Sequence, residues 1–110
     1  MKHSFLNLSL SYCRMVDNGR TIQSTLDHMC KEVVELQEEV IKYRDDLPPG
    51  DDGVIGEAID VMICACDIIY QKNPSISSDY LMTLIHAKLD KWKTVYGNPV
   101  VPTETPNPQV

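Results

Sequence analysis

The sequence predicts an all-α fold, an antiparallel bundle of four or five helices in one domain. In the long segments, apolar residues recur at three- and four-residue steps, the spacing that places them on one face of a helix. No segment shows the alternation of apolar and polar residues that is typical of a strand. Glycine and proline gather in short stretches between these segments, where they favour turns. We place the domain at residues 1–96.

The first two segments differ in how clearly they predict a helix. Phe5–Val16 carries apolar residues of mixed period, and we interpret it as a helix. Thr21–Arg44 is much clearer, because its apolar residues form one helical stripe. These residues are Leu26, Met29, Cys30, Val33, Leu36, Val40 and Tyr43. Thr21 or Ser24 is expected to cap its start.

The third segment, Asp52–Lys72, is the most apolar part of the chain. It begins with acidic residues suited to a helix N-terminus and is then apolar on almost every side. Such a helix has to be central or shared between subunits, so we expect a homodimer, or two dimers paired into a tetramer, to complete the core. We do not expect the helix to span a membrane, because Glu57, Asp60 and Asp67 interrupt it.

The fourth segment, Ser75–Tyr96, again shows a helical apolar pattern, with Ser75, Ser77 or Ser78 as its cap. The rest of the chain, residues 97–110, is rich in proline and has no apolar period. We expect this tail to be extended or disordered.

The charge of the chain restricts its partners. Ten basic and sixteen acidic residues give a net charge of −6, which opposes binding to nucleic acid or to an anionic membrane. Most of the acidic residues lie between Asp27 and Asp60, and such a region attracts divalent cations.

The four cysteines contain no CxxC pair, and the chain begins without the apolar stretch of a secretory signal. We therefore expect a reducing, cytoplasmic setting and buried free thiols.

Asp60 is the most informative residue, because an uncompensated carboxylate in the middle of an apolar helix costs several kcal/mol or is forced to protonate. Glu57 lies one helical turn before it, and Glu32 and Glu35 form a second pair with the same spacing on the preceding segment. The short link between the two segments favours antiparallel packing, which brings the four carboxylates together. Oxygen ligands without histidine or thiolate select Mg²⁺ or Mn²⁺.

Other interpretations of these acids remain open. Asp60 could instead form a buried ion pair with a lysine. Glu38 and Glu39 are expected to lie on a solvated helix face. Asp67 could extend the site or point to solvent, and we expect it to point to solvent.

Two short motifs carry a resemblance to a known family. The strings KEVVEL at Lys31–Leu36 and GEAIDV at Gly56–Val61 are similar to the metal-binding motifs Glu-x-x-Glu and Glu-x-x-Asp of the MazG-like all-α nucleoside triphosphate pyrophosphatases. The resemblance extends over residues 21–96. The stretch AKLDKWK at Ala87–Lys93 resembles the lysine-containing later helix of that family, although Trp92 precedes the position of the family's asparagine and no arginine follows.

The resemblance implies that Glu32, Glu35, Glu57 and Asp60 bind Mg²⁺, with Mn²⁺ as a substitute. It also implies hydrolysis of a (d)NTP to the monophosphate and pyrophosphate, by attack of a metal-activated water at the α-phosphorus. Pool control or housecleaning is the expected role.

Four further residues are candidates for substrate binding. Lys88 and Lys91 could offset the charge of the leaving group, and Trp92 could stack on a base, although a core or interface position is more common for a lone tryptophan. His28, one turn before Glu32, could contact substrate. The chain lacks a glycine-rich phosphate loop, so its metal dependence should be absolute.

Two other functions remain to be considered. A related enzyme of the same superfamily would act on a different substrate, such as phosphoribosyl-ATP or dUTP. A non-catalytic helical interaction protein with an acidic face is the alternative from a different class. A di-iron carboxylate bundle is disfavoured, because no Glu-x-x-His pair occurs on these helices.

Overall fold

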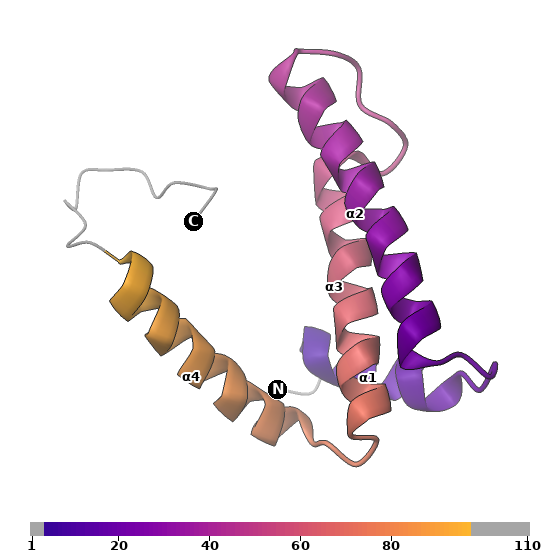
Figure 1. The fold of residues 1–110 in the computed structure, drawn as a ribbon, viewed down its shortest axis with the longest axis vertical. Helices are drawn as coiled ribbons and strands as arrows, with labels where there is room; N and C mark the ends of the chain where they lie inside the picture. Colours follow the sequence, from indigo (N-terminus) through magenta and orange to yellow (C-terminus); the bar gives the residue numbers. More distant parts are fainter. Residues whose placement is uncertain (1–3, 98–110) are drawn as a thin grey trace. The chain divides into compact units, whose positions relative to one another are not determined.

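The computed structural model describes residues 4–97, and over that range it contains four helices and no strand (Figure 1). The helices are α1 (Phe5–Met15), α2 (Ile22–Arg44), α3 (Gly53–Lys72) and α4 (Ser78–Tyr96). The predicted all-α fold class is therefore confirmed. Among the described helices, none combines the length with the apolar character that crossing a membrane would require.

The chain divides into two compact units, residues 1–76 with α1 to α3 and residues 77–110 with α4. The predicted single domain over residues 1–96 stays a prediction. Most of the predicted tail, from residue 98 onward, lies outside the described residues.

In the first unit, α2 and α3 lie side by side and run antiparallel, joined by the loop at one end, as Figure 1 shows. Helix α1 packs against α3. The buried apolar side chains of this unit come from α1, from α3 and from the segment after α3. They are Leu10, Cys13, Cys64, Cys66 and Ile76. Three of the four cysteines are thus buried as expected, whereas Cys30 is exposed on α2.

The start of α2 is fixed by its own side chains. Thr21 accepts a hydrogen bond from the backbone N–H of Ser24, and the hydroxyl of Ser24 accepts one from the N–H of Thr21. This reciprocal arrangement satisfies two amide groups at the helix N-terminus that have no partner within the helix. The expected cap therefore involves both candidate residues.

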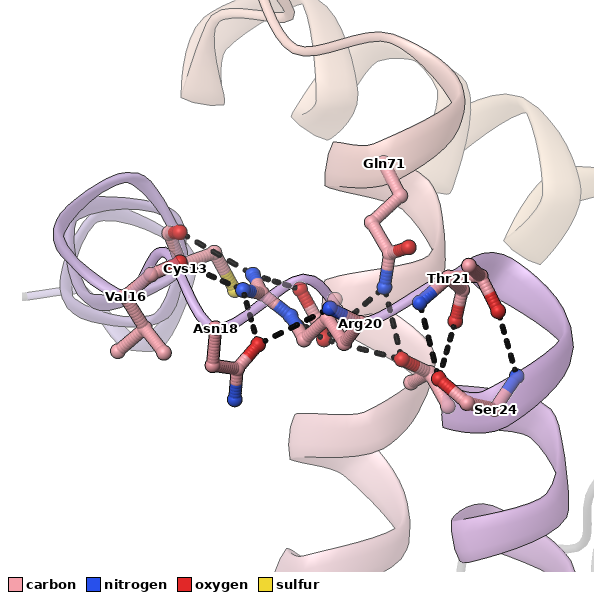
Figure 2. A network of polar contacts seen from close by, with 9 residues as sticks. Cys13, Val16, Asn18, Arg20, Thr21, Ser24 and Gln71 are labelled. Atoms are coloured by element: carbon pink, nitrogen blue, oxygen red, sulfur yellow. Dashed lines mark hydrogen bonds and ion pairs between the residues drawn. The ribbon is translucent and has the colours of Figure 1, made fainter.

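Arg20 holds the α1–α2 connection against α3 (Figure 2). Its Nε and Nη2 donate to the two carboxylate oxygens of Asp67 at 2.6 and 2.7 Å. The same guanidinium donates to the backbone carbonyls of Val16 and Cys13. Gln71 also donates to Asp67, at 3.2 Å. The expectation that Asp67 points to solvent is wrong, because its side chain is 13% exposed and paired with an arginine.

Glu39 anchors the loop between α2 and α3. Its carboxylate accepts hydrogen bonds from the backbone N–H of Gly50 at 2.7 Å and from Nζ of Lys42 at 2.8 Å. Glu39 is only 6% exposed, so the expectation that it lies on a solvated face is also wrong. Its neighbour Glu38 is exposed, as expected. The anchor fixes the loop that leads into the acidic start of α3.

In the second unit, Ser77 caps α4 by accepting a hydrogen bond from the backbone N–H of Tyr80, so the helix begins later than the expected Ser75. Trp92 and Tyr96 form an edge-to-face ring pair with centroids 5.9 Å apart. Trp92 is nevertheless 56% exposed.

Candidate metal centre

Carboxylates from α2 and α3 form two overlapping groups. One oxygen each from Glu32, Glu35 and Glu57 lie within 4.8 Å of one another, and the same holds for Asp52, Glu57 and Asp60. Glu57 belongs to both groups. The antiparallel packing of α2 and α3 therefore brings the two sequence motifs together. The role of Glu32, Glu35, Glu57 and Asp60 as ligands stays a prediction.

Two oxygens in this cluster are buried and lack a hydrogen-bond partner within the described part of the chain. They are Oε2 of Glu32 and Oε2 of Glu57. Glu57 as a whole is 9% exposed, and the side chain of Glu32 is 14% exposed. A buried carboxylate oxygen without a partner is costly, because it loses water and gains nothing in return.

Burial, and the closeness of the carboxyl groups of the cluster to one another, raise the pKa values of two of them. Burial, followed by the neighbouring carboxyls of Glu35, Asp52 and Asp60, raises the pKa of Glu57 to about 7. Burial also raises the pKa of Glu32, against the opposing effect of a hydrogen bond from His28. Each shift means that the ionised form is disfavoured in this environment.

Lysine and arginine do not neutralise these acids in the described structure. Over residues 4–97, the ion pairs of lysine and arginine join Arg20 to Asp67, Lys42 to Glu39 and Arg44 to Asp45. The alternative in which Asp60 pairs with a lysine is thus not found within that range. Glu32 has the imidazole of His28 at 2.9 Å, and this ring is largely exposed.

The donor set fits a hard divalent cation. All of the converging atoms are carboxylate oxygens, which Mg²⁺ and Mn²⁺ prefer, and the cluster offers no thiolate or second imidazole for zinc. The buried Oε2 atoms of Glu32 and Glu57 supply the further test, since a cation is the partner that would satisfy them. The residues present therefore fit such an ion.

The pattern of paired carboxylates missed Asp52. This residue precedes α3 as its N-cap, yet its side chain makes no capping hydrogen bond. Instead its carboxylate joins Glu57 and Asp60. In the sequence, the only feature that points to this position of Asp52 is the pair of glycines that follows it, Gly53 and Gly56. Two glycines permit a tight bend, but they do not by themselves indicate that the chain bends there.

A cavity of about 360 Å³ lies beside the cluster in the first unit. It is bounded by α1, the α1–α2 connection, α2 and α3. Cys64, one turn after Asp60, lines it, and so does His28, which also bonds Glu32. Arg20, Thr25 and Asp67 provide part of its polar wall. Its volume is that of a small-molecule site.

Of the four residues expected to bind substrate, only His28 lies in this unit. Lys88, Lys91 and Trp92 are exposed on α4, in the second unit, and their assignment to substrate binding stays a prediction. Comparison of the chain with models of protein families, with curated proteins and with solved structures gave no match.

Proposed function

We propose that this chain is a Mg²⁺-dependent nucleotide pyrophosphohydrolase, which cleaves a (d)NTP to the (d)NMP and pyrophosphate. The observation that carries the proposal is the pair of buried, unpartnered oxygens, Oε2 of Glu32 and Oε2 of Glu57, within a cluster of carboxylates from two helices. Such a cluster lowers its free energy by binding a cation. The resemblance of both motifs to the MazG-like family supports the same activity.

In the proposed reaction, the carboxylates of the cluster bind the cation. Glu32 and Glu35 from α2, with Glu57 and Asp60 from α3, hold the cation, and Mn²⁺ is expected to substitute for Mg²⁺. Held there, Mg²⁺ would offset triphosphate charge and would lower the pKa of a coordinated water. In the reaction, a water oxygen bonds to the α-phosphorus as the bond from phosphorus to the α,β-bridging oxygen breaks. Pyrophosphate leaves with the electron pair, and the water proton is released to solvent.

The adjoining cavity is the proposed binding site for the nucleoside part of the substrate. It begins at His28, one helical turn from Glu32, so a triphosphate held at the carboxylates directs its sugar and base toward it. One turn of helix is about 5.4 Å, which is of the order of the spacing between an α-phosphate and its sugar ring. His28 then lies at the boundary between the phosphate and nucleoside parts.

Release of pyrophosphate from a panel of canonical and modified nucleotides, with MgCl₂ or with EDTA, tests the proposal. Wild-type protein is expected to turn over at least one triphosphate with Mg²⁺ and none with EDTA. Asp60→Asn is expected to lower kcat/KM at least about a hundredfold, since removing a preorganised charged group commonly costs that much. Glu38→Gln, which neutralises an exposed carboxylate of α2, is the matched control and should leave the rate unchanged.

Absence of any turnover by wild-type protein would refute the proposal, as would full activity of Asp60→Asn. Calorimetry with Mg²⁺ adds a second readout. If it finds only weak, delocalised binding and no nucleotide is cleaved, a non-catalytic interaction protein with an acidic face is the better description.

We also propose that the protein is a homodimer, or a tetramer of two dimers, working in the reducing cytoplasm in nucleotide-pool control or housecleaning. Helix α3 keeps large apolar side chains in water, since Ile55 is 78% and Met62 is 50% exposed. A contiguous apolar face is a common mark of an interface. Light scattering at micromolar concentration should give at least twice the mass of 12.4 kDa, and a monomer would contradict the proposal.

A further inference from the structure

Asn18 and Gly19 lie side by side in the connection between α1 and α2. Both residues are exposed, and Gly19 has a φ of +71°, a left-handed conformation that a residue without a Cβ adopts at no steric cost. A Cβ added at Gly19 would meet nothing within 4 Å. The junction between the two residues is therefore open to water.

The backbone nitrogen of Gly19 is free to react. An asparagine loses its side-chain amide when the nitrogen of the next residue attacks its Cγ, which requires an N–H that is not held by another group. The N–H of Gly19 makes no hydrogen bond within the described residues. Because glycine has no Cβ, the approach of this nitrogen to Cγ of Asn18 is also unhindered.

The other four asparagines of the chain do not meet this requirement. Three of them precede a proline, whose nitrogen carries no hydrogen, and these are Asn73, Asn98 and Asn107. Asn7 precedes Leu8 within α1, and the backbone N–H of Leu8 already donates to the carbonyl of Ser4 at 3.1 Å. Asn18 thus differs from every other asparagine of the sequence in the amide that follows it.

Arg20 holds the side-chain oxygen of Asn18, as Figure 2 shows. The backbone N–H and the Nη1 of Arg20 donate to Oδ1 of Asn18 at 3.2 and 3.4 Å. Attack at Cγ places negative charge on this oxygen, and donors that already point at an oxygen stabilise the charge that develops there. The amide nitrogen Nδ2, which has to leave, makes no hydrogen bond within residues 4–97.

We propose that Asn18–Gly19 is a self-modification site of the folded chain, at which deamidation loosens the α1–α2 connection. The nitrogen of Gly19 gives up its proton and bonds to Cγ of Asn18, while the bond from Cγ to Nδ2 breaks and ammonia leaves with that proton. Water then opens the succinimide ring at one of its two carbonyls. Opening at Cγ gives aspartate, and opening at the backbone carbonyl gives isoaspartate. Water is the only co-reactant, and the inference does not depend on the proposed function.

Both products place a carboxylate beside Arg20, whose guanidinium already pairs with Asp67. Isoaspartate adds a second change, because the chain then continues through the former side chain and is one bond longer. Since Arg20 donates to the carbonyls of Val16 and Cys13, a longer path before Arg20 disturbs the contacts that hold the connection against α3. Asn18 also lines the cavity beside the carboxylate cluster, so the new charge appears in its wall.

Ageing of the full chain in neutral buffer, followed by tryptic digestion and mass spectrometry, tests the site. Trypsin cleaves after Arg14 and Arg20, so the peptide Met15–Arg20 contains Asn18 and no other asparagine. This peptide is expected to gain the mass of an amide-to-acid exchange and to become a substrate of an isoaspartyl methyltransferase. The gain should be at least as fast in the folded chain as in the chain unfolded in urea. Asn18→Gln, whose ring would be one atom larger, should show no gain at this peptide, and Asn73→Gln is the matched control that should behave like wild type.

An unchanged peptide Met15–Arg20 in aged, folded wild-type protein would overturn the inference. A gain that is faster in urea than in the folded chain would also overturn it, because the fold would then protect Asn18. Equal gains at Asn7 or Asn73 would contradict the argument as well, since the free amide of Gly19 would not determine the site.

Thermal denaturation tests the effect on the connection. The deamidated fraction, separated by ion exchange on its added negative charge, is expected to have a lower Tm than fresh protein. Its Tm should also lie below that of Asn18→Asp, which carries the charge on an unaltered backbone. A fraction that contains isoaspartate and keeps the Tm of fresh protein would refute the loosening of the connection.

Discussion

Replacing Arg20 by alanine should destabilise the first unit strongly. The guanidinium makes two charge-assisted bonds to Asp67, at 2.6 and 2.7 Å, and bonds to two backbone carbonyls. The two side chains are 18% and 13% exposed, so Arg20→Ala leaves a mostly buried carboxylate without its cation, and it also removes a donor from two backbone carbonyls. Removing one partner of a buried pair costs about 3–5 kcal/mol, and the partial exposure favours the lower end, about 3 kcal/mol.

Thermal and urea denaturation measure this cost. About 3 kcal/mol corresponds to a fall in Tm of about 12–24 °C for a domain of this size. Arg44→Ala is the matched control, because the Arg44–Asp45 pair has side chains 71% and 48% exposed, and such a surface change should cost about 0.5 kcal/mol or less. Arg20→Lys should fall between, since an ammonium keeps the charge but not the two-pronged geometry. Equal effects of Arg20→Ala and Arg44→Ala would refute the reasoning.

The same pair has a defined pH dependence. Burial alone would raise the pKa of Asp67, but hydrogen bonds from Arg20, Cys13 and Gln71 hold it below its usual range. The contribution of this carboxylate is therefore complete above the unfolded pKa, about 3.9, and is lost as pH falls through the lower folded value. The stability difference between wild type and Arg20→Ala should shrink below pH 4. A constant difference from pH 7 to pH 2 would contradict this account.

Three further predictions concern the cluster, a helix cap and the loop anchor. Burial and the neighbouring carboxyls raise the pKa of Glu57 from 4.5 to about 7, so the Tm measured in EDTA should fall as the pH rises between these two values. Addition of MgCl₂ should restore the Tm at pH 8 but not at pH 5. Calorimetric scans in EDTA that give the same Tm at every pH would exclude this account. Thr21→Ala removes the acceptor of the α2 cap and should cost about 1 kcal/mol in urea denaturation. Glu39→Ala leaves the N–H of Gly50 without its acceptor and should cost about 1–3 kcal/mol, with Glu38→Ala as a nearly neutral control in the same assay.

The helices could be predicted from sequence because their apolar periods and caps are local. The expected second helix, Thr21–Arg44, differs by one residue from α2, Ile22–Arg44, since Thr21 is its cap. The fourth helix was less well predicted, because three nearby serines are equally good caps by composition. In the structure Ser75 instead bonds the side chain of Asn73, which leaves Ser77 to start the helix.

The side chains that were predicted wrongly have partners in loops or connections. Asp67 pairs with Arg20, 47 positions earlier in the chain, and Glu39 accepts a bond from the backbone of Gly50 in a loop. Helical periodicity places a residue on a face but cannot identify a partner that depends on the path of a connection. Asp52 was missed for the same reason, because its position depends on the left-handed turn at Gly53.

The contrast between the two acidic positions of α3 bears on function. Asp67 and Glu57 lie on the same helix and both are largely removed from water, so each requires a positive partner. The chain supplies one to Asp67, an arginine held by two backbone carbonyls, and the pKa of that carboxyl falls. Among residues 4–97 no positive side chain pairs with Glu57, whose pKa rises to about 7. A carboxylate that served only the fold would gain from the first arrangement. The second destabilises the folded chain unless a cation arrives from solution, which is the behaviour expected of a metal ligand and not of a structural ion pair.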